Sequence, residues 1–188
     1  MAKTTKTSGT GDLAGKTDTI VFTALARDRP GLVERLAETV ALHSGNWVDS
    51  SMSRLGGEFA GIVRVDVPDM KVAELKQALA GLARERIDVI MHEHAGGPAP
   101  EGMRARLEFT GLDHPGIVLE VTRALTRHGV SIEELETAVS RGSMGAEPMF
   151  RAEAEVVLPD RLDMGDLRGA LEEIAQDIMV DIHLEASA

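Results

Sequence analysis

Hydrophobic and polar residues alternate along short stretches of this chain and recur at helical spacing in the stretches between them. Alternation over residues 19–26 predicts a strand, because successive side chains of a strand point to opposite faces. Leu32, Leu36 and Val40 then recur every four residues, which is the spacing of an amphipathic helix. We expect this helix to begin at Pro30, since proline is tolerated in a first turn, where its missing N–H would be unpaired anyway.

The pattern of the next segment predicts three more strands and a second helix. Residues 46–55 read as a strand, and Gly56-Gly57 can adopt the positive φ angles of a tight hairpin turn. Residues 59–67 place apolar side chains on one face of the following strand and charged ones on the other. A helical stripe over residues 72–84 and a strand over residues 87–94 complete the order β-α-β-β-α-β.

The whole pattern occurs twice. The turn Asp28-Arg29-Pro30-Gly31 after the first strand returns 85 residues later as Asp113-His114-Pro115-Gly116, and Asn46 falls on Ser131 at the same shift. A repeat of this length indicates two modules of roughly 80 residues each. The expected elements of the second copy are strands over 107–112, 132–141, 150–156 and 180–184, helices over 117–125 and 164–178, and a loop over 142–148 in place of the Gly-Gly turn.

Two such modules give an α+β fold of two tandem ferredoxin-like βαββαβ sandwiches, each with an antiparallel sheet covered by helices on one face. We divide the chain into a disordered N-terminal tail (1–16), a first domain (17–94), a linker rich in glycine and proline (95–103) and a second domain (104–186). We also expect association between modules, because exposed edge strands are templates for pairing.

The repeated turn is the strongest candidate for a ligand site. The N–H groups near Gly31 and Gly116 belong to helix N-termini, where unpaired donors and the helix dipole attract a carboxylate. Asp28 and Asp113 add carboxylates that could hold an ammonium group, so the turn matches a free amino acid. The alternative is structural: each aspartate could cap its helix, and the turn would then only connect a strand to a helix.

These features resemble the ACT-domain family, and over residues 17–186 the tandem resembles the glycine cleavage system transcriptional repressor family. The resemblance rests on the β-α-β-β-α-β order, the Asp-x-Pro-Gly turn, and the Gly-Asn-Trp or Val-Ser-Ile segment that opens the second strand. It implies modules that associate in pairs, bind a small amino acid where they meet, and change the behaviour of a partner. The implied ligand-binding residues are Asp28, Arg29, Pro30, Gly31, Leu32, Asn46 and Trp47 in the first copy, and Asp113, His114, Pro115, Gly116, Ile117, Ser131 and Ile132 in the second.

The two implied sites differ in their polar groups. Asn46 offers both a donor and an acceptor, whereas Ser131 offers less to a ligand. His114 stands where the first copy has Arg29 and could make anion affinity depend on pH. Trp47, the single tryptophan, either packs in the core or lines the ligand.

Composition argues against several other functions. A formal net charge of −11 with 3% aromatic residues disfavours direct nucleic-acid binding, and Arg27/Arg29 and Arg84/Arg86 form pairs rather than a basic stripe. With no cysteine there is no disulfide and no thiolate chemistry. No apolar run approaches the roughly 18 residues of a membrane helix, and the N-terminus lacks the apolar core of a secretory signal. We therefore expect a cytoplasmic protein without membrane contact.

The sequence does not favour an enzyme. No nucleophile with a base and no phosphate loop stands out, so we expect neither catalysis nor a cofactor. His92 and His94 share a strand face but lack a third metal ligand, while His43 and His128 are expected at helix C-termini. The leading hypothesis is a homodimeric regulatory protein that senses an amino acid and acts through a protein partner, in the control of glycine metabolism or transcription. The alternative is a protein-interaction module that binds no ligand.

Overall fold

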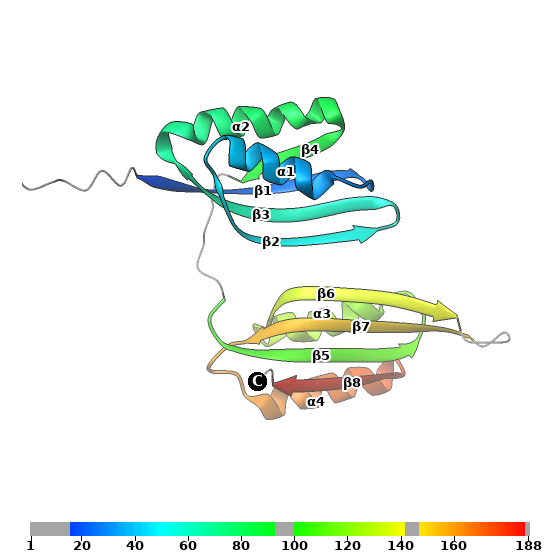
Figure 1. The fold of residues 1–188 in the computed structure, drawn as a ribbon. Helices are drawn as coiled ribbons and strands as arrows, with labels where there is room; N and C mark the ends of the chain where they lie inside the picture. The colour runs from blue at the N-terminus through cyan, green and yellow to red at the C-terminus, as the bar shows by residue number, and fades with distance from the viewer. Residues whose placement is uncertain (1–15, 93–99, 142–146, 187–188) are drawn as a thin grey trace, which may run out of the picture. The chain divides into compact units, whose positions relative to one another are not determined.

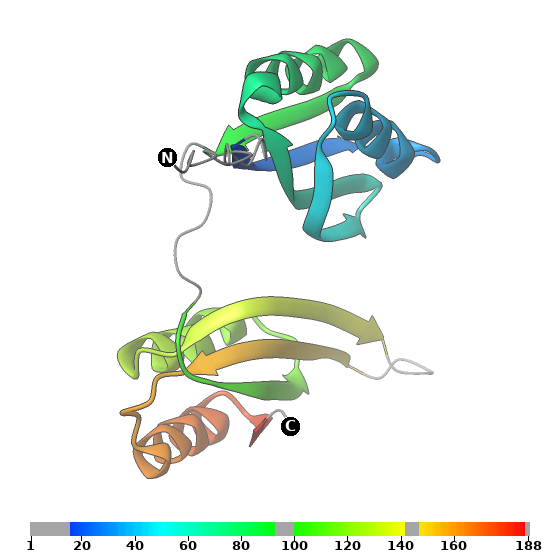
Figure 2. The ribbon, with the colours of Figure 1, turned by 60° about the vertical axis from the view of Figure 1, so that its left-hand side comes forward.

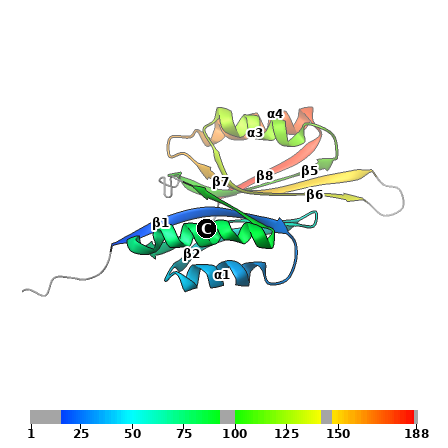
Figure 3. The ribbon, with the colours of Figure 1, turned by 90° about the horizontal axis from the view of Figure 1, so that it is seen from above.

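The computed structural model describes residues 16–92, 100–141 and 147–186. The chain divides into two compact units, Met1–Gly97 (unit 1) and Pro98–Ala188 (unit 2). In each unit two helices cover one face of a four-stranded antiparallel sheet (Figures 1 and 3). The predicted α+β class, with two tandem ferredoxin-like sandwiches, is confirmed.

Unit 1 has the predicted order of elements. They are β1 (Thr17–Arg27), α1 (Leu32–Leu42), β2 (Asn46–Leu55), β3 (Glu58–Pro68), the 3-10 turn η1 (Asp69–Lys71), α2 (Val72–Gly81), the 3-10 turn η2 (Leu82–Glu85) and β4 (Ile87–His92). The strands lie in the order β2-β3-β1-β4. The predicted second helix over 72–84 is thus an α-helix that ends at Gly81 and continues as a 3-10 turn, and residues 93 and 94 of the predicted last strand lie outside the described residues.

Unit 2 repeats this arrangement, with both helices on the same face of its sheet (Figure 2). Its elements are β5 (Met103–Leu112), α3 (Ile117–Arg127), β6 (Ser131–Arg141), β7 (Pro148–Leu158), α4 (Met164–Asp177) and β8 (Val180–Ala186), with strand order β6-β7-β5-β8. The prediction that Pro148 belongs to a loop is wrong. Pro148 opens β7 and pairs with Arg141, a place where proline is tolerated because it is the first residue of the strand. Residues 142–146 of that predicted loop lie outside the described residues.

Alternation along the central strands explains the core of unit 1. Phe22 on β1 and Val63 and Val65 on β3 are fully buried, and Leu36 of α1 and Leu79 of α2 cover them from the helical side. Each such large apolar side chain contributes about 1.5–3 kcal/mol on burial. The sheet and its two helices are therefore held together by one apolar layer, which fixes the positions of the turns at the sheet ends.

The Gly56-Gly57 hairpin turn has the predicted conformation. Gly56 lies at φ 61 and Gly57 at φ 86, both in the left-handed region, and Leu55 pairs with Glu58 across the turn. Two positive φ angles in a two-residue loop match the twist of the flanking strands. The turn also places the start of β3 beside the end of β1, where Glu58 pairs with Arg27.

The open faces of the two sheets differ in character. On unit 1, Thr23 pairs with Ile62 and Ile90 on either side, and these isoleucines are 54% and 61% exposed. On unit 2 the corresponding face carries ion pairs that Arg106 and Arg151 form with glutamates of β5 and β7. The open face of the first sheet thus combines exposed isoleucines with the Arg64–Asp49 ion pair, whereas that of the second carries a network of ion pairs.

Candidate functional site

The repeated turn has the same backbone in both units. Gly31 and Gly116 occupy the N-cap positions of α1 and α3 in left-handed conformations, at φ 90 and φ 104. The first helices accordingly begin at Leu32 and Ile117. The prediction that α1 begins at Pro30 is wrong, because a left-handed residue cannot continue a right-handed helix and Gly31 separates the proline from it.

Glycine is required at these turns by backbone conformation rather than by crowding. A Cβ at Gly31 would meet nothing closer than Glu34 Oε2 at 4.0 Å, and a Cβ at Gly116 would meet nothing within 4 Å. Residues with a Cβ pay about 1–2 kcal/mol in the left-handed region, whereas glycine does not. Open space therefore lies beside both helix N-termini.

The capping alternative for the two aspartates is wrong. Within the described residues no side chain caps α1 or α3. Asp28 instead accepts a hydrogen bond from Arg54 Nη1 on β2 at 3.1 Å. Its backbone N–H donates to the Gly57 carbonyl at 2.9 Å, as the N–H of Asp113 donates to the Pro148 carbonyl at 2.8 Å. The first N–H groups of both helices remain without a side-chain acceptor, which is the state that attracts an anion.

The second residue of each turn ties it to the junction before the last strand, which lies at the same end of the sheet. Arg29 Nη2 donates to the Glu85 carbonyl at 2.7 Å, and His114 Nε2 lies 3.1 Å from the Ile178 carbonyl. Each carbonyl belongs to the residue just before a left-handed residue, Arg86 or Met179, which precedes the last strand of its unit. Arg29 and His114 thus contact equivalent carbonyls although their side chains differ in chemistry.

The residues that open the second strands lie away from the turns within each unit. Asn46 pairs with Asp66, whereas Arg27, just before the turn, pairs with Glu58. Eight residue steps along β3 separate Glu58 from Asp66, about 27 Å at the rise of a strand. Ser131 pairs with Val157 and is likewise at the far end of its sheet. The structure therefore does not bring the two halves of either implied site together inside one unit.

The aromatic and apolar members of those strand starts pack inward. Trp47 is half-buried against the core of unit 1 and donates from Nε1 to Ser50 Oγ at 3.2 Å, and Ile132 packs against the core of unit 2. A β-bulge follows each of them, between Trp47 and Asp49 and between Ile132 and Glu134. Bulges re-aim side chains, so the two edge strands share a bent start.

Comparison with known proteins decides the family. Models of the ACT domain match residues 18–92 and, separately, residues 105–176. The chain belongs to the ACT-domain family. A solved structure of an unknown protein from Galdieria sulphuraria shares 30% identity with this chain, and the match covers 92% of this chain and 100% of that one, with a TM-score of 0.82. The structure of a putative glycine cleavage system transcriptional repressor shares 15% identity over 91% of this chain and 98% of its own, with a TM-score of 0.69. No curated protein matches the chain.

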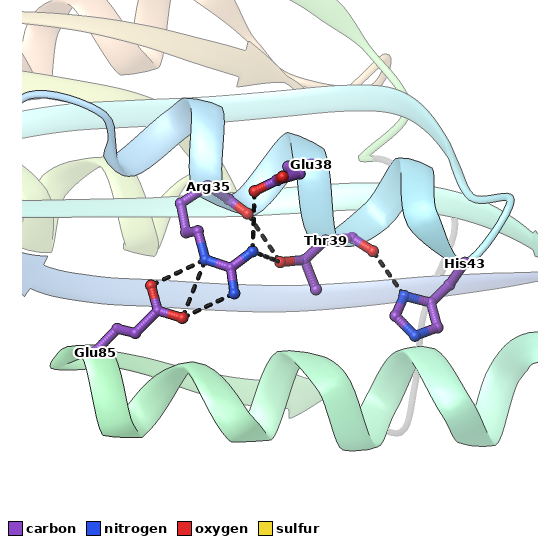
Figure 4. A network of polar contacts seen from close by, with 5 residues as sticks. All are labelled: Arg35, Glu38, Thr39, His43 and Glu85. Atoms are coloured by element: carbon purple, nitrogen blue, oxygen red, sulfur yellow. Dashed lines mark hydrogen bonds and ion pairs between the residues drawn. The ribbon is translucent and has the colours of Figure 1, made fainter.

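An ion-pair network links α1 of the first ACT domain to the turn before β4 (Figure 4). Arg35 donates from Nε and Nη2 to the Glu85 carboxylate at 2.8–3.0 Å and from Nη1 to Glu38 at 3.1 Å. The hydrogen bonds from Arg35 lower the pKa of the Glu85 carboxyl below its ordinary value. The second ACT domain has Glu120 and Ile178 at the equivalent positions, so this network is specific to the first.

An open pocket of about 460 Å³ lies beside the turn of the second ACT domain. It lies where β5 ends, β7 begins and α4 turns into β8. Its lining comprises Leu112, Asp113, His114, Glu147, Pro148, Asp177, Ile178 and Met179. Asp113 and His114 are candidates that the sequence indicates, and the other six are missed. No sequence signal marks Met179, a non-glycine residue at φ 52 that exposes 72% of its surface.

The histidines at the first helices have structural roles, as expected. His43 and His128 are the C-cap residues of α1 and α3, and their Nδ1 atoms lie 2.8 and 2.9 Å from the carbonyls of Thr39 and Ala124. His92 Nε2 lies 2.7 Å from Thr23 Oγ1, while His94 is outside the described residues. Across the described ranges no three histidine, aspartate or glutamate side chains gather as metal ligands. Nor does any helix in these ranges have the length and apolar character needed to span a membrane.

Proposed function

We propose that this protein is a regulatory protein that binds a free amino acid at the Asp-x-Pro-Gly turns of its ACT domains and transmits the bound state to a protein partner. The observation that carries the proposal is the pair of uncapped helix N-termini, each behind a left-handed glycine with open space beside it. Free N–H groups suit the carboxylate of the ligand, and Asp28 or Asp113 suits its ammonium group.

The strand starts enter the proposal through association. Asn46 and Ser131 lie at the sheet end opposite to the turns, so they can reach a ligand at a turn only from another ACT domain. We include a homodimer for this reason. The exposed Leu25, Ile62 and Ile90 on the open face of the first sheet, 45%, 54% and 61% exposed, further support association.

The finer form of the proposal is control of amino acid metabolism, glycine metabolism in particular, or of transcription through a protein partner. The putative glycine cleavage system transcriptional repressor carries such a name, and its 15% identity supports the fold alone. We place the protein in the cytoplasm, without catalytic activity, cofactor, direct nucleic-acid contact or membrane contact. The net charge of −11 supports the absence of nucleic-acid binding, which a mobility-shift titration at physiological salt would test.

Calorimetry of the purified protein against each common amino acid tests the proposal. At least one should bind with a dissociation constant of about a millimolar or tighter, a free energy of roughly −4 kcal/mol. Failure of every amino acid to bind at millimolar concentration would contradict the proposal and favour the second candidate, an interaction module without a ligand. The exposed apolar face of the first sheet is the observation that favours that candidate.

A further inference from the structure

The pocket of the second ACT domain combines an apolar wall with free carboxylates. Leu112, Pro148, Ile178 and Met179 supply the apolar side chains. Its volume of about 460 Å³ is within the range of small-molecule sites, roughly 300–1,000 Å³. Met179 stands at the rim with 72% of its surface exposed, and its unbranched thioether can adapt to an apolar partner.

The charged groups of the pocket select a positive ligand group. Asp113, Glu147 and Asp177 line it, and none of the three side chains forms an ion pair or hydrogen bond with another described residue. His114 is already engaged, because Nε2 lies 3.1 Å from the Ile178 carbonyl and Nδ1 lies 3.2 Å from the Pro115 carbonyl. A ligand ammonium group would give these carboxylates charge-assisted hydrogen bonds. The carboxylate of an amino acid would meet like charge among them, so it has to face the uncapped N-terminus of α3 instead.

The first ACT domain carries the opposite charge at the same place. Its residues equivalent to Leu112, His114, Asp177 and Met179 are Arg27, Arg29, Arg84 and Arg86. The equivalents of Asp113 and Ile178 are the acidic Asp28 and Glu85, so four positive side chains stand against two negative ones. They converge because Ala26 of β1 pairs with Ile87 of β4, as Gly111 of β5 pairs with Val180 of β8, and because Arg29 contacts the Glu85 carbonyl. The two copies of the turn therefore stand in surroundings of opposite charge.

We propose that the second ACT domain selects amino acids with an apolar side chain, held by its pocket through the ammonium group and that side chain. Asp113 and Asp177 bind the ammonium group, and Ile178 and Met179 contact the side chain. The inference rests on the proposed function in taking an amino acid as the ligand. It adds the ligand class, and it makes the turn between α4 and β8 the element that sets specificity.

Three matched probes separate the contributions of charge and side chain. Leucine, isoamylamine and 4-methylpentanoate share one branched body, and the last two lack the carboxylate and the ammonium group of leucine respectively. In protein labelled at its methionine methyl groups, leucine and isoamylamine should shift the Met179 resonance and leave Met70 of the first domain unmoved. The affinity of 4-methylpentanoate should be about ten- to a hundredfold weaker, the range that charge-assisted hydrogen bonds give.

A charge reversal at Asp177 tests the role of this carboxylate. Asp177→Arg places the residue of the first domain, Arg84, at the pocket and should weaken leucine binding about ten- to a hundredfold. Glu172→Arg, which makes the same change of charge at an exposed position of α4 outside the pocket, is the matched control and should leave leucine binding unchanged. The Met149 and Met164 resonances report whether the second domain stays folded, and Asp113→Asn, which keeps the shape of the side chain, is a milder test of the same charge.

The outcomes separate this inference from the proposed function. Equal affinity of 4-methylpentanoate and isoamylamine, or full leucine binding by folded Asp177→Arg, would overturn the inference. If calorimetry finds a bound amino acid while Met179 remains unmoved by leucine, the inference fails and the proposed function stands. If no amino acid binds at all, the proposed function itself has failed.

Discussion

His114 places its Nε2 atom 3.1 Å from the carbonyl oxygen of Ile178, which ties the turn before α3 to the turn before β8. Arg29 makes the equivalent contact to Glu85 in the first ACT domain. Two different side chains therefore contact the equivalent carbonyl in the two domains. In both copies this contact is part of the scaffold of the candidate site.

Replacement of His114 tests this scaffold role. His114→Ala should lower the free energy of unfolding of the second ACT domain by about 0.5–1.5 kcal/mol, the net worth of a hydrogen bond. His114→Arg should recover most of this loss, because arginine makes the same contact in the first domain. Urea denaturation followed by circular dichroism measures both. Equal destabilisation by the two substitutions would contradict the role.

The turn glycines give a prediction about backbone strain. Gly31→Ala should destabilise the first ACT domain by about 1–2 kcal/mol, because φ 90 is unfavourable for a residue with a Cβ. Gly81→Ala is the matched control, since Gly81 has a helical φ of −64 and a Cβ there meets nothing within 4 Å. It should stabilise the domain by about 0.5–1 kcal/mol. Thermal unfolding that shifts in the same direction for both would contradict this account of the turn.

The Arg35–Glu85 ion pair gives a prediction about pH. Since Arg35 lowers the pKa of Glu85 in the folded state, the pair stabilises the first ACT domain above the unfolded pKa, and this stability is lost as the pH falls through the folded pKa. Glu85→Gln should therefore lower the melting temperature slightly at pH 7. Its difference from the parent should shrink as the pH falls below the ordinary glutamate pKa of about 4.3 and disappear in stronger acid. Glu172→Gln, on an exposed position of α4, should leave the melting temperature unchanged at pH 7 and in acid. A difference for Glu85→Gln that persists into acid would contradict the prediction.

The open face of the first sheet gives a prediction about association. Ile62→Glu combined with Ile90→Glu should convert the proposed homodimer to a monomer, because two charges would then be buried in an apolar contact. Met70→Glu, at a position 82% exposed on η1, should not change the mass. Light scattering after gel filtration measures both. A dimer that survives the double substitution would place the contact elsewhere.

The sequence predicts those element bounds that depend only on the local pattern of residues. The bounds of β2 agree with the prediction over residues 46–55, because Gly45 and the Gly56-Gly57 turn bracket one alternating segment. The start of α1 could not be predicted, because the left-handed conformation of Gly31 is not visible in a pattern that also suits proline in a first turn. Asp28 reads as a cap from its spacing, yet its acceptor role toward Arg54 depends on the pairing of distant strands.

The pocket and its charged surroundings could not be predicted from the local sequence pattern. Arg27/Arg29 and Arg84/Arg86 are separate pairs in the sequence, and only the pairing of β1 with β4 brings them to one place. Met179 lies at the rim because it adopts a positive φ, and a positive φ at a residue other than glycine is not visible in the sequence. Both features depend on contacts between elements far apart along the chain.

Amide resonances during an amino acid titration show whether the repeated turns bind the ligand. With the ligand that calorimetry identifies, the largest shifts in the backbone amides should fall at the starts of α1 or α3, at Gly31, Leu32 and Val33 or at Gly116, Ile117 and Val118. Shifts confined to residues remote from both turns, with these amides unmoved at saturation, would contradict binding at the turns.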